Sequence, residues 1–358
     1  MTLRRQSGPF VEGDQVQLTD PKGRMTTVTL EQGKALHTHR GILPHEQLIG
    51  LSDGSVVENS AGVVYLALRP LLNDFVMSMP RGAAIVYPKD AGQIVSIADV
   101  FPGATVVEAG VGSGALSMSL LRAIGPSGRL LSFERRAEFA DIARGNAAAF
   151  FGEAPENWTI TLGDLQDALP ATVAPATVDR VVLDMLAPWE CLPAVAEALA
   201  PGGVVLCYVA TATQLSRTAE AIRGMERFTE PLSSETMVRG WNVDGLSVRP
   251  DHRMVAHTGF LITARLLAPG APPFTKARRG SKTEHSEEDV ELWTPGALGD
   301  RQASDKRLRK AVRESQSLAE RSALRNSPRQ TEGTAPLESA DGTAEQPPAA
   351  PDEPGASR

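Results

Sequence analysis

Residues 105–117 read TVVEAGVGSGALS, and this stretch decides the fold. A β-branched run leads into Glu108, glycines follow at positions 110, 112 and 114, and helix-forming residues continue from Ala115 to Leu121. A strand that ends in glycines and feeds a helix gathers backbone N–H groups and a helix N-terminus at one point. The glycines also let a ligand approach the main chain closely. The sequence therefore predicts a nucleotide-binding turn between a buried parallel strand and a helix.

The glycine spacing alone does not identify the nucleotide, because Gly110-x-Gly112-x-x-Ala115 also fits the loose dinucleotide pattern. No lysine follows the glycines, which argues against a phosphate-binding P-loop. Glu134 ends the next expected strand, about twenty residues after the last glycine, where an acid can bind a ribose. Such an acid suits S-adenosylmethionine and NAD equally, but Glu108 has no role in a pyrophosphate site and favours the methyl donor. A turn that only packs a helix on a sheet remains the third alternative.

Strands and helices alternate from this turn to Leu267. The expected strands are 129–134, 159–162, 180–183 and 204–210, and the expected helices are 137–151, 189–199 and 212–225. Repeated βα units give a parallel sheet with helices on both faces. Two further strand-like stretches, 235–242 and 259–267, have no helix between them, so one of them should run antiparallel at the edge. This predicts an α/β fold with a seven-strand Rossmann-like sheet of the class I methyltransferase kind.

The region before residue 68 has a different pattern. Short alternating runs are separated by turn signals at 20–23 and 53–54, with no room for a βαβ crossover, so residues 1–67 are predicted to form a small N-terminal β domain, a barrel or sandwich. Residues 37–41 (HTHRG) are expected as a loop between strands, either facing RNA or simply solvated. Residues 68–270 then form the catalytic domain. Within it, Tyr87 is expected at a rim or as a packed aromatic, and Asp90 as the cap of a helix over 91–100.

Beyond Pro269 the composition changes to Pro, Gly, Ala, Ser and charges. Residues 271–358 are predicted to be a largely disordered tail, and residues 330–358 in particular cannot bury enough apolar surface to become ordered. Two basic patches stand out, 276–282 (KARRGSK) and 306–313 (KRLRKAVR). The second is expected on a helix over 304–324. Either patch could contact phosphates, or the helix and tail could simply be solvated.

Composition limits the remaining classes of function. The N-terminus has no apolar signal region and no apolar run reaches membrane-spanning length, so no membrane association is expected. Cys191 and Cys207 lack metal-binding spacing and are expected as buried free thiols in a reducing cytoplasm. No histidine pattern indicates a metal. The net charge of −7 is the main objection to RNA binding, which must then come from local basic clusters.

Carboxylates follow four successive strands. In a doubly wound sheet, ligands bind at the carboxyl ends of the strands, so Glu108, Glu134, Asp164 and Asp184 should converge. Glu134 is placed for ribose hydroxyls and Asp164 for the adenine amino group of a cofactor. Asp184 is not needed for the cofactor, which makes it the candidate that faces the methyl acceptor. The alternative is that Asp184 only caps the helix after Pro188.

From about Gly8 to Leu267 the chain resembles the bacterial tRNA (adenine-N1)-methyltransferases, which methylate N1 of adenine 58 in the tRNA T-loop. The resemblance is carried by five motifs: His39-Arg40-Gly41, Tyr87-Pro88-Lys89-Asp90, the stretch EAGVGSG at 108–114, Asp184 with Pro188-Trp189, and His257-Thr258-Gly259-Phe260. It covers nearly three quarters of the chain. The resemblance implies S-adenosylmethionine as cofactor, tRNA as substrate and a homotetramer.

The resemblance also implies roles for individual residues. Cofactor contacts are expected from Val86, Ser113, Gly114, Ala115, Glu134, Asp164, Leu165 and Asp184, in addition to Glu108, Gly110 and Gly112 of the turn. Asp184 and Tyr87 are expected to be catalytic, and His39, Arg40, Tyr87 and Trp189 to bind the substrate. The alternatives are a methyltransferase for another RNA position or a non-RNA acceptor, a NAD-dependent oxidoreductase, and a non-catalytic RNA-binding subunit.

Overall fold

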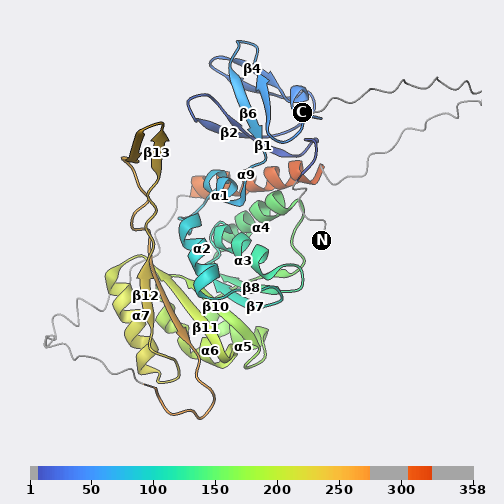
Figure 1. Ribbon diagram of the computed structural model, residues 1–358. Helices are drawn as coiled ribbons and strands as arrows, with labels where there is room; N and C mark the ends of the chain where they lie inside the picture. Colours follow the sequence, from blue (N-terminus) through green and yellow to red (C-terminus); the bar gives the residue numbers. More distant parts are fainter. Residues whose placement is uncertain (1–6, 275–304, 325–358) are drawn as a thin grey trace, which may run out of the picture. The chain divides into compact units, whose positions relative to one another are not determined.

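The computed structural model describes residues 7–274 and 305–324 (Figure 1). Its centre is a seven-stranded sheet with strand order β12-β15-β11-β10-β7-β8-β9. The strands are β7 (Thr105–Ala109), β8 (Arg129–Glu134), β9 (Trp158–Leu162), β10 (Val178–Asp184), β11 (Leu199–Val209), β12 (Leu232–Glu235) and β15 (Phe260–Arg265). The predicted α/β fold with a seven-strand sheet is confirmed.

One strand of this sheet is antiparallel, but its predicted place is wrong. Strand β15 runs antiparallel to both β11 and β12 and lies between them, so the edge of the sheet is β12. Helix α7 (Ala212–Gly224) carries the chain past the position next to β11 before β12 begins. Strand β15 then occupies the position between β11 and β12. It runs antiparallel to both, because no helix between β12 and β15 returns the chain to the end of the sheet at which β12 begins.

Helices cover both faces of the sheet: α2 (Pro88–Ile97), α3 (Ala115–Ile124), α4 (Ala137–Phe151), α5 (Leu165–Thr172), α6 (Leu192–Ala198) and α7. Alternate strand residues point to opposite faces. Val106 therefore packs with α2, α3 and α4 in one buried cluster, and Val107 packs with α5, α6 and α7 in another. The two cores hold the carboxyl ends of the central strands at one edge.

The N-terminal strands form a separate, four-stranded antiparallel sheet with order β2-β1-β6-β5. Its strands are β1 (Gln15–Thr19), β2 (Met25–Thr29), β5 (Ser55–Glu58) and β6 (Val64–Leu68). A hairpin of β3 (Ala35–Thr38) and β4 (Gly41–Pro44), which the sequence did not reveal, puts His39 and Arg40 at an exposed tip. A short helix, α1 (Leu72–Ser78), follows the sheet.

Three predicted element boundaries are wrong. Helix α2 begins at Pro88 with Tyr87 in the N-cap position, because proline suits the first turn of a helix, and Asp90 is buried instead of capping a helix from Ala91. The expected helix 189–199 is a 3₁₀ turn over Pro188–Glu190 followed by α6. Strand β11 accordingly begins at Leu199 and not at Val204.

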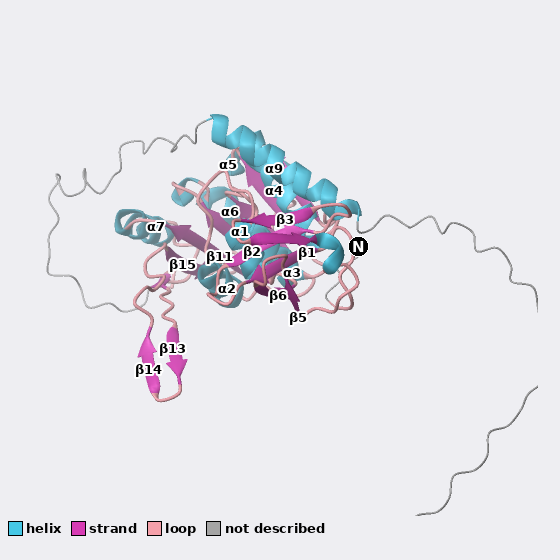
Figure 2. Cartoon of the chain, turned by 90° about the horizontal axis from the view of Figure 1, so that it is seen from above, coloured by secondary structure: helices cyan, strands magenta, loops and turns pink. Residues whose placement is uncertain are grey.

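The expected strand 235–242 is also wrong. Strand β12 ends at Glu235, and the chain leaves the sheet to form a hairpin of β13 (Trp241–Asp244) and β14 (Ser247–Pro250). Gly245, with φ +53°, follows Asp244 in its turn. Both views show this hairpin projecting away from the sheet (Figures 1 and 2).

Helix α9 (Asp305–Leu324) lies along α4 (Figure 1). The alternative of a purely solvated helix is wrong, because Ala311, Ser315 and Ser322 are buried. The patch 276–282 and the tail segments 275–304 and 325–358 lie outside the described residues.

Two smaller findings concern composition. Cys191 and Cys207 are free thiols, both buried, as expected. Across the described ranges, no helix is long and apolar enough to cross a membrane.

Candidate active site

The three glycines of the turn after β7 all have positive φ, but they face different surroundings. A Cβ on Gly110 would lie 1.8 Å from the carbonyl oxygen of Asp184, so this turn packs directly against the end of β10. A Cβ on Gly114 would lie 3.2 Å from Ala143 of α4. At Gly112 the nearest atom is 3.9 Å away. Gly110 and Gly114 thus allow close packing, whereas Gly112 leaves its backbone open.

Two cavities open at the carboxyl edge of the sheet. A cleft of about 890 Å³ is lined by residues that include Tyr87, Gly110, Gly112, Glu134, Asp184 and Tyr208. A smaller cavity of about 220 Å³ is lined by residues that include Gly110, Glu134, Asp164, Leu165 and Asp184. Gly110, Glu134 and Asp184 line both, so Asp184 lies where the two cavities meet. Three of the four carboxylates predicted to converge therefore do so.

Glu134 is held rigidly at this junction. Its carboxylate accepts hydrogen bonds from the backbone N–H groups of Gly112 (3.2 Å) and Arg136 (3.1 Å). The side chain is almost fully buried. A fixed carboxylate with remaining lone pairs is suited to accept hydrogen bonds from a pair of ligand hydroxyls.

Asp164 borders the smaller cavity and pairs with Arg135 across 2.7 Å. Both side chains are exposed enough for water to screen the pair, which makes it a weak contact that a ligand can replace. Leu165 lines the same cavity from the first turn of α5.

Glu108 differs from its prediction. Its side chain is fully buried and lines neither cavity; the carboxylate accepts hydrogen bonds from the hydroxyls of Ser117 (2.8 Å) and Ser132 (2.6 Å). Burial raises the pKa of Glu108 to about 7, against the effect of these hydrogen bonds. Strand alternation turns Glu108 into the sheet–helix layer, so it ties β7, β8 and α3 together beneath the glycine turn.

Several other predicted contacts lie just behind the cavity walls. Val86, Ser113 and Ala115 are buried and line neither cavity, and Gly114 also lies behind the surface. The Ser113 hydroxyl accepts a hydrogen bond from the Gly82 N–H at 3.2 Å, which joins the glycine turn to the loop before α2. These residues position the walls.

The predicted substrate residues are not all brought together. Tyr87 lines the larger cleft. Trp189 is half-buried beneath Arg217, whose guanidinium carbon lies 4.2 Å from the ring centroid, and it lines neither cavity. His39 and Arg40 are exposed at the tip of the β3–β4 hairpin and line neither cavity.

Asp184 does not cap the following helix. The 3₁₀ turn at Pro188 begins after Ala187 and has no side-chain cap, so that alternative is wrong. Burial at the base of the cleft raises the pKa of Asp184 to about 7, and the charge of Glu134 raises it further. A carboxyl group that titrates near neutrality and faces a cleft is a candidate for proton transfer.

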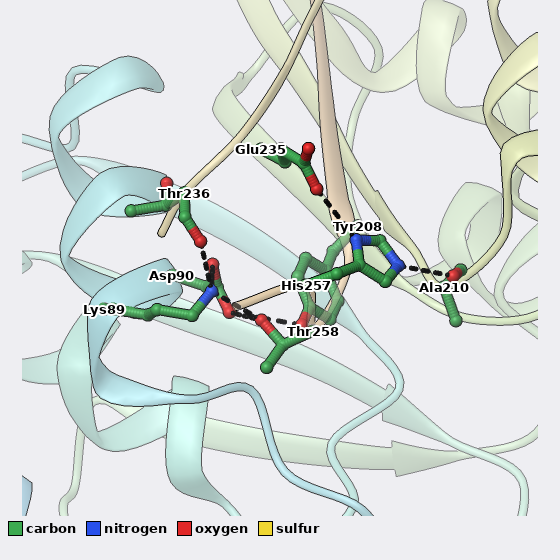
Figure 3. Close-up of polar contacts among 8 residues, drawn as sticks. All are labelled: Lys89, Asp90, Tyr208, Ala210, Glu235, Thr236, His257 and Thr258. Carbon is green, nitrogen blue, oxygen red and sulfur yellow. Dashed lines mark hydrogen bonds and ion pairs between the residues drawn. The ribbon is translucent and has the colours of Figure 1, made fainter. Parts of the chain in front are cut away.

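A polar network that the sequence did not reveal joins the start of α2 to β11 and to the segment before β15 (Figure 3). Lys89 Nζ donates to Asp90 Oδ1 (2.7 Å), to the Thr236 carbonyl (2.7 Å) and to Thr258 Oγ1 (2.6 Å). The hydroxyls of Thr258 and Tyr208 donate to Asp90 Oδ2 at 2.5 and 3.3 Å. The motifs YPKD and HTGF therefore contact each other.

This network fixes Tyr208 against Asp184. The two residues are paired in the β10–β11 ladder, and Tyr208 and Thr258 both line the larger cleft. A Cβ on Gly259 would lie 2.4 Å from the Tyr208 ring, so only glycine leaves room for it. His257 lies next to this network, with Nδ1 2.9 Å from Glu235 Oε2 and Nε2 3.0 Å from the Ala210 carbonyl (Figure 3). These contacts raise the pKa of His257.

Replacing Glu108 by glutamine should remove part of the pH dependence of stability. The pKa of Glu108 is raised from 4.5 to about 7 in the folded protein. The stabilising contribution of this group to the free energy of unfolding is therefore complete below pH 4.5 and is lost as the pH rises through about 7. Relative to wild type, Glu108→Gln should gain up to about 3 kcal/mol in unfolding free energy between pH 5 and 8. Urea unfolding at both pH values measures this, with exposed Glu138→Gln as control. An unchanged pH profile in Glu108→Gln would contradict this assignment.

The chain matches two family models. Residues 8–57 match the TrmI-like N-terminal model, and residues 62–248, more than half of the chain, match the model described as the GCD14 subunit of the tRNA methyltransferase complex. The tRNA (adenine(58)-N(1))-methyltransferase TrmI of Thermus thermophilus is 35% identical over 252 residues, which is 69% of this chain and 95% of that protein. The chain belongs to the TrmI/GCD14 family of tRNA methyltransferases.

Other TrmI/GCD14 relatives and solved structures agree with the fold. The tRNA (adenine(57)-N(1)/adenine(58)-N(1))-methyltransferase TrmI of Methanocaldococcus jannaschii is 29% identical over 60% of this chain and 83% of its own length. The TrmI structure from Aquifex aeolicus is 26% identical over 73% of this chain and all of that one, with a TM-score of 0.64. A Thermotoga maritima structure, titled a SAM-dependent O-methyltransferase, is 33% identical over 73% of this chain and 96% of its own, with a TM-score of 0.68.

The residues of this TrmI/GCD14 site fit a cationic nucleoside donor. Glu134, Asp164 and Asp184 place three carboxylates at the smaller cavity, and Glu134 and Asp184 also line the larger cleft, where Gly112 leaves open backbone. The ammonium and sulfonium groups of S-adenosylmethionine are positive, and its ribose offers two hydroxyls. Among the described residues, no group of three or more His, Cys, Asp or Glu side chains could hold a metal ion.

Proposed function

We propose that this methyltransferase transfers a methyl group from S-adenosylmethionine to N1 of adenine 58 in the T-loop of tRNA. The observation that carries the proposal is the place of Asp184, a carboxyl group at the junction of two cavities and not needed to hold a ribose. The names of the Thermus and Methanocaldococcus relatives support the acceptor.

The smaller cavity is suited to the nucleoside half of the donor. Glu134 would accept hydrogen bonds from the ribose hydroxyls, and Asp164 and Leu165 would border the adenine. The wall residues Val86, Ser113, Gly114 and Ala115 would shape this site from behind, and Glu108 would keep the glycine turn in place. S-adenosylmethionine supplies an already activated methyl group when bound.

The larger cleft is suited to the target base. A T-loop adenine is stacked in folded tRNA, so it must be flipped out to reach an enzyme site. Tyr87 and Asp184 line the same cleft, and an adenine ring between them would be stacked by the tyrosine and contacted by the carboxylate. Trp189 stays a predicted substrate contact, although it lines neither cavity and its ring lies beneath Arg217. His39 and Arg40 stay predicted tRNA contacts at the hairpin tip.

The residues of this chain would mainly align the base with the methyl group and stabilise the charge that develops on the base. N1 of neutral adenine carries a lone pair in the ring plane, and holding it in line with an activated methyl group removes most of the entropic barrier. Attack leaves positive charge on the base. The Asp184 carboxylate would accept a hydrogen bond from the N6 amino group, stabilise that charge and take the proton.

The pH dependence of kcat/KM follows from the raised pKa of Asp184. Because the ionised carboxylate is the active form and its pKa is about 7, the rate should rise roughly tenfold per pH unit below that value and level off above it. Steady-state assays at limiting tRNA between pH 5.5 and 8.5 measure this profile. A flat profile would show that Asp184 does not act through its charge.

Methyl incorporation into tRNA transcripts tests the acceptor. An unmodified transcript should accept one labelled methyl group per molecule, and the same transcript with adenine 58 replaced by guanine should accept none. Incorporation that is equal in the two transcripts would refute adenine 58 as the target. Binding of S-adenosylhomocysteine but not NADH would separate the donor from the dinucleotide alternative.

A second candidate is a methyltransferase for another RNA position or a non-RNA acceptor. The observation that favours it is the O-methyltransferase title of the Thermotoga structure, since the donor site does not identify the acceptor. The guanine-58 transcript discriminates here too, because a different RNA position would still be methylated in it.

We also propose the domain division 1–67, 68–270 and 271–358. The two sheets and the two family matches, 8–57 and 62–248, support the first boundary. Strand β15, which completes the central sheet at Arg265, supports the second.

A homotetramer is proposed from the projecting β13–β14 hairpin. Its apolar side chains are exposed on a single chain, among them Trp241, Val243, Leu246 and Val248. Apolar patches of this kind mark protein–protein contacts, and a second copy of the chain would cover them.

Replacing Val248 by lysine should dissociate the assembly. Val248 is 58% exposed and pairs with Val243 across the hairpin, so a charge there would disfavour a buried interface without disturbing the chain's own core. Light scattering should give a tetramer for wild type and a smaller species for Val248→Lys. Val56→Lys, at a valine that is 65% exposed in β5, is the matched control and should remain tetrameric. A wild-type monomer would refute the proposal.

A further inference from the structure

Helix α9 lies beyond both family matches, the second of which ends at residue 248, and beyond the resemblance, which ends at Leu267. It is nevertheless packed into the catalytic unit. Leu308, Ala311 and Val312 form a cluster with Phe139 and Ile142 of α4. The helix therefore has a defined position beside the active site.

The contact between α4 and α9 is close because small residues face each other. A Cβ on Gly145 would lie 2.8 Å from the Ser315 hydroxyl and 2.9 Å from its backbone. Further along the helix, the Ser322 hydroxyl donates to the carbonyl of Ala149 at 2.9 Å. Such a backbone approach leaves little freedom for the helix to slide, so the residues at its beginning have fixed neighbours.

Arg307, in the first turn of α9, lines the same cleft as Tyr87 and Asp184. Arg81 and Arg136 line this cleft too. Arg136 lies over the Phe139 ring at 3.8 Å, whereas Arg307 is exposed and has no hydrogen-bond or ion-pair partner within the residues that the structure describes. The Arg307 guanidinium is thus available to a ligand at the cleft.

The first half of α9 is positively charged, whereas the whole chain has a net negative charge. Residues 305–313 carry five basic side chains and one acid, although the whole chain has a net charge of −7. The carboxylates inside the cleft attract a cationic donor but repel the phosphates of an incoming nucleic acid. Arginines at the cleft overcome that repulsion, because guanidinium groups bind phosphate bidentately.

A groove of about 910 Å³ extends this basic surface. Arg81 and Arg307 line both the cleft and the groove, and Arg313 and Arg321 line the groove further along α9. Glu314 also borders the groove, and Arg321 pairs with Glu31 at 3.5 Å. Of these α9 arginines, Arg307 is therefore the one that reaches the catalytic cleft.

We propose that α9 is a tRNA-binding element, in which Arg307 binds a phosphate of the backbone next to the flipped adenine. The inference rests on the proposed function, since it deepens the way the same cleft takes its substrate. It adds to the enzyme a binding residue from beyond the family-matched region.

The test compares Arg307→Ala with Arg309→Ala in the full-length enzyme. Both variants remove one arginine from the first turns of α9, but Arg309 lines neither the cleft nor the groove. Arg307→Ala should raise the KM for tRNA about tenfold and make the plot of log affinity against log salt shallower by about 0.7 to 0.9. Arg309→Ala should change both by much less. Equal effects in the two variants would overturn the proposal.

A variant that leaves the charge unchanged tests whether the packing of α9 against α4 matters for tRNA binding. Ser315→Leu cannot fit against Gly145 and should displace α9, so it should raise the KM for tRNA as much as Arg307→Ala does. Both variants should bind S-adenosylhomocysteine like wild type; weaker binding in Arg307→Ala would place Arg307 in the donor site and overturn the inference. An active wild type with an unaffected Arg307→Ala refutes the inference alone, whereas a wild type that methylates no tRNA refutes the proposed function.

Discussion

Replacing Asp184 by alanine or asparagine is expected to lower the rate of methyl transfer to tRNA about a thousandfold while the fold and donor binding persist. The carboxyl group lies at the junction of the two cavities, and its pKa is raised to about 7, so the neutral asparagine costs nothing in buried charge. In the proposed mechanism, the substitution removes the negative charge beside a base that becomes positive as it reacts.

Single-turnover methylation measures the expected loss of rate, and S-adenosylhomocysteine binding measures whether the donor is still bound. Asp167→Asn is the matched control, since Asp167 is exposed on α5 and lines neither cavity. Near-normal methylation by Asp184→Ala would remove Asp184 from the mechanism, whatever the binding data show.

Replacing Gly110 by alanine should destabilise the protein by about 4 kcal/mol or more, or prevent folding altogether. The backbone at Gly110 has φ +88°, and the new Cβ would lie 1.8 Å from the Asp184 carbonyl oxygen. Relief of that clash requires the glycine turn to separate from the end of β10. Because Gly110 and Asp184 line both cavities, the walls of both would then move.

Gly112→Ala is the matched control, two residues away. Its φ is +54° and the nearest atom is 3.9 Å from the new Cβ, so the cost in stability should be about 1–2 kcal/mol. Because the Gly112 N–H donates to Glu134, the residue proposed to hold the ribose, this variant should fold but bind S-adenosylhomocysteine less tightly. Thermal unfolding and titration calorimetry separate the two variants. Equal stability of Gly110→Ala and Gly112→Ala would show that the turn does not pack as described.

Local patterns and one topological rule were enough to predict much of this molecule. The apolar runs and the glycine turn predicted the central strands, because the hydrophobic periodicity of strands and helices can be recognised from residues that are close together in the sequence. Glu134, Asp164 and Asp184 could be brought together in advance, because parallel strands present their carboxyl ends at one edge.

Features that depend on distant partners could not be predicted. Glu108 faces Ser117 and Ser132, and only the strand's orientation in the sheet decides that it points there and not into a cavity. Asp90 and Thr258 are 168 residues apart, and neither carries a local sign of the other.

The sequence also did not show which apolar side chains are exposed and which helix face is packed. The expected strand 235–242 reaches only the first two residues of the hairpin at Trp241–Pro250. The hairpin itself was not predicted, because its apolar side chains are the same ones that a core would use. For α9, the spacing of Leu308, Ala311, Val312 and Ser315 could have shown a packed face, but its many charges suggested solvent.

The most direct test of the account is to identify the methylated nucleoside in a tRNA transcript after reaction with the enzyme. Digestion and mass spectrometry should show N1-methyladenosine, and fragment mapping should place it at position 58, the position named for the Thermus relative. The proposed in-plane attack and the proposed contact between Asp184 and the N6 amino group both require N1 as the acceptor. N6-methyladenosine, or methylation at an unrelated position, would contradict the proposed orientation of the base.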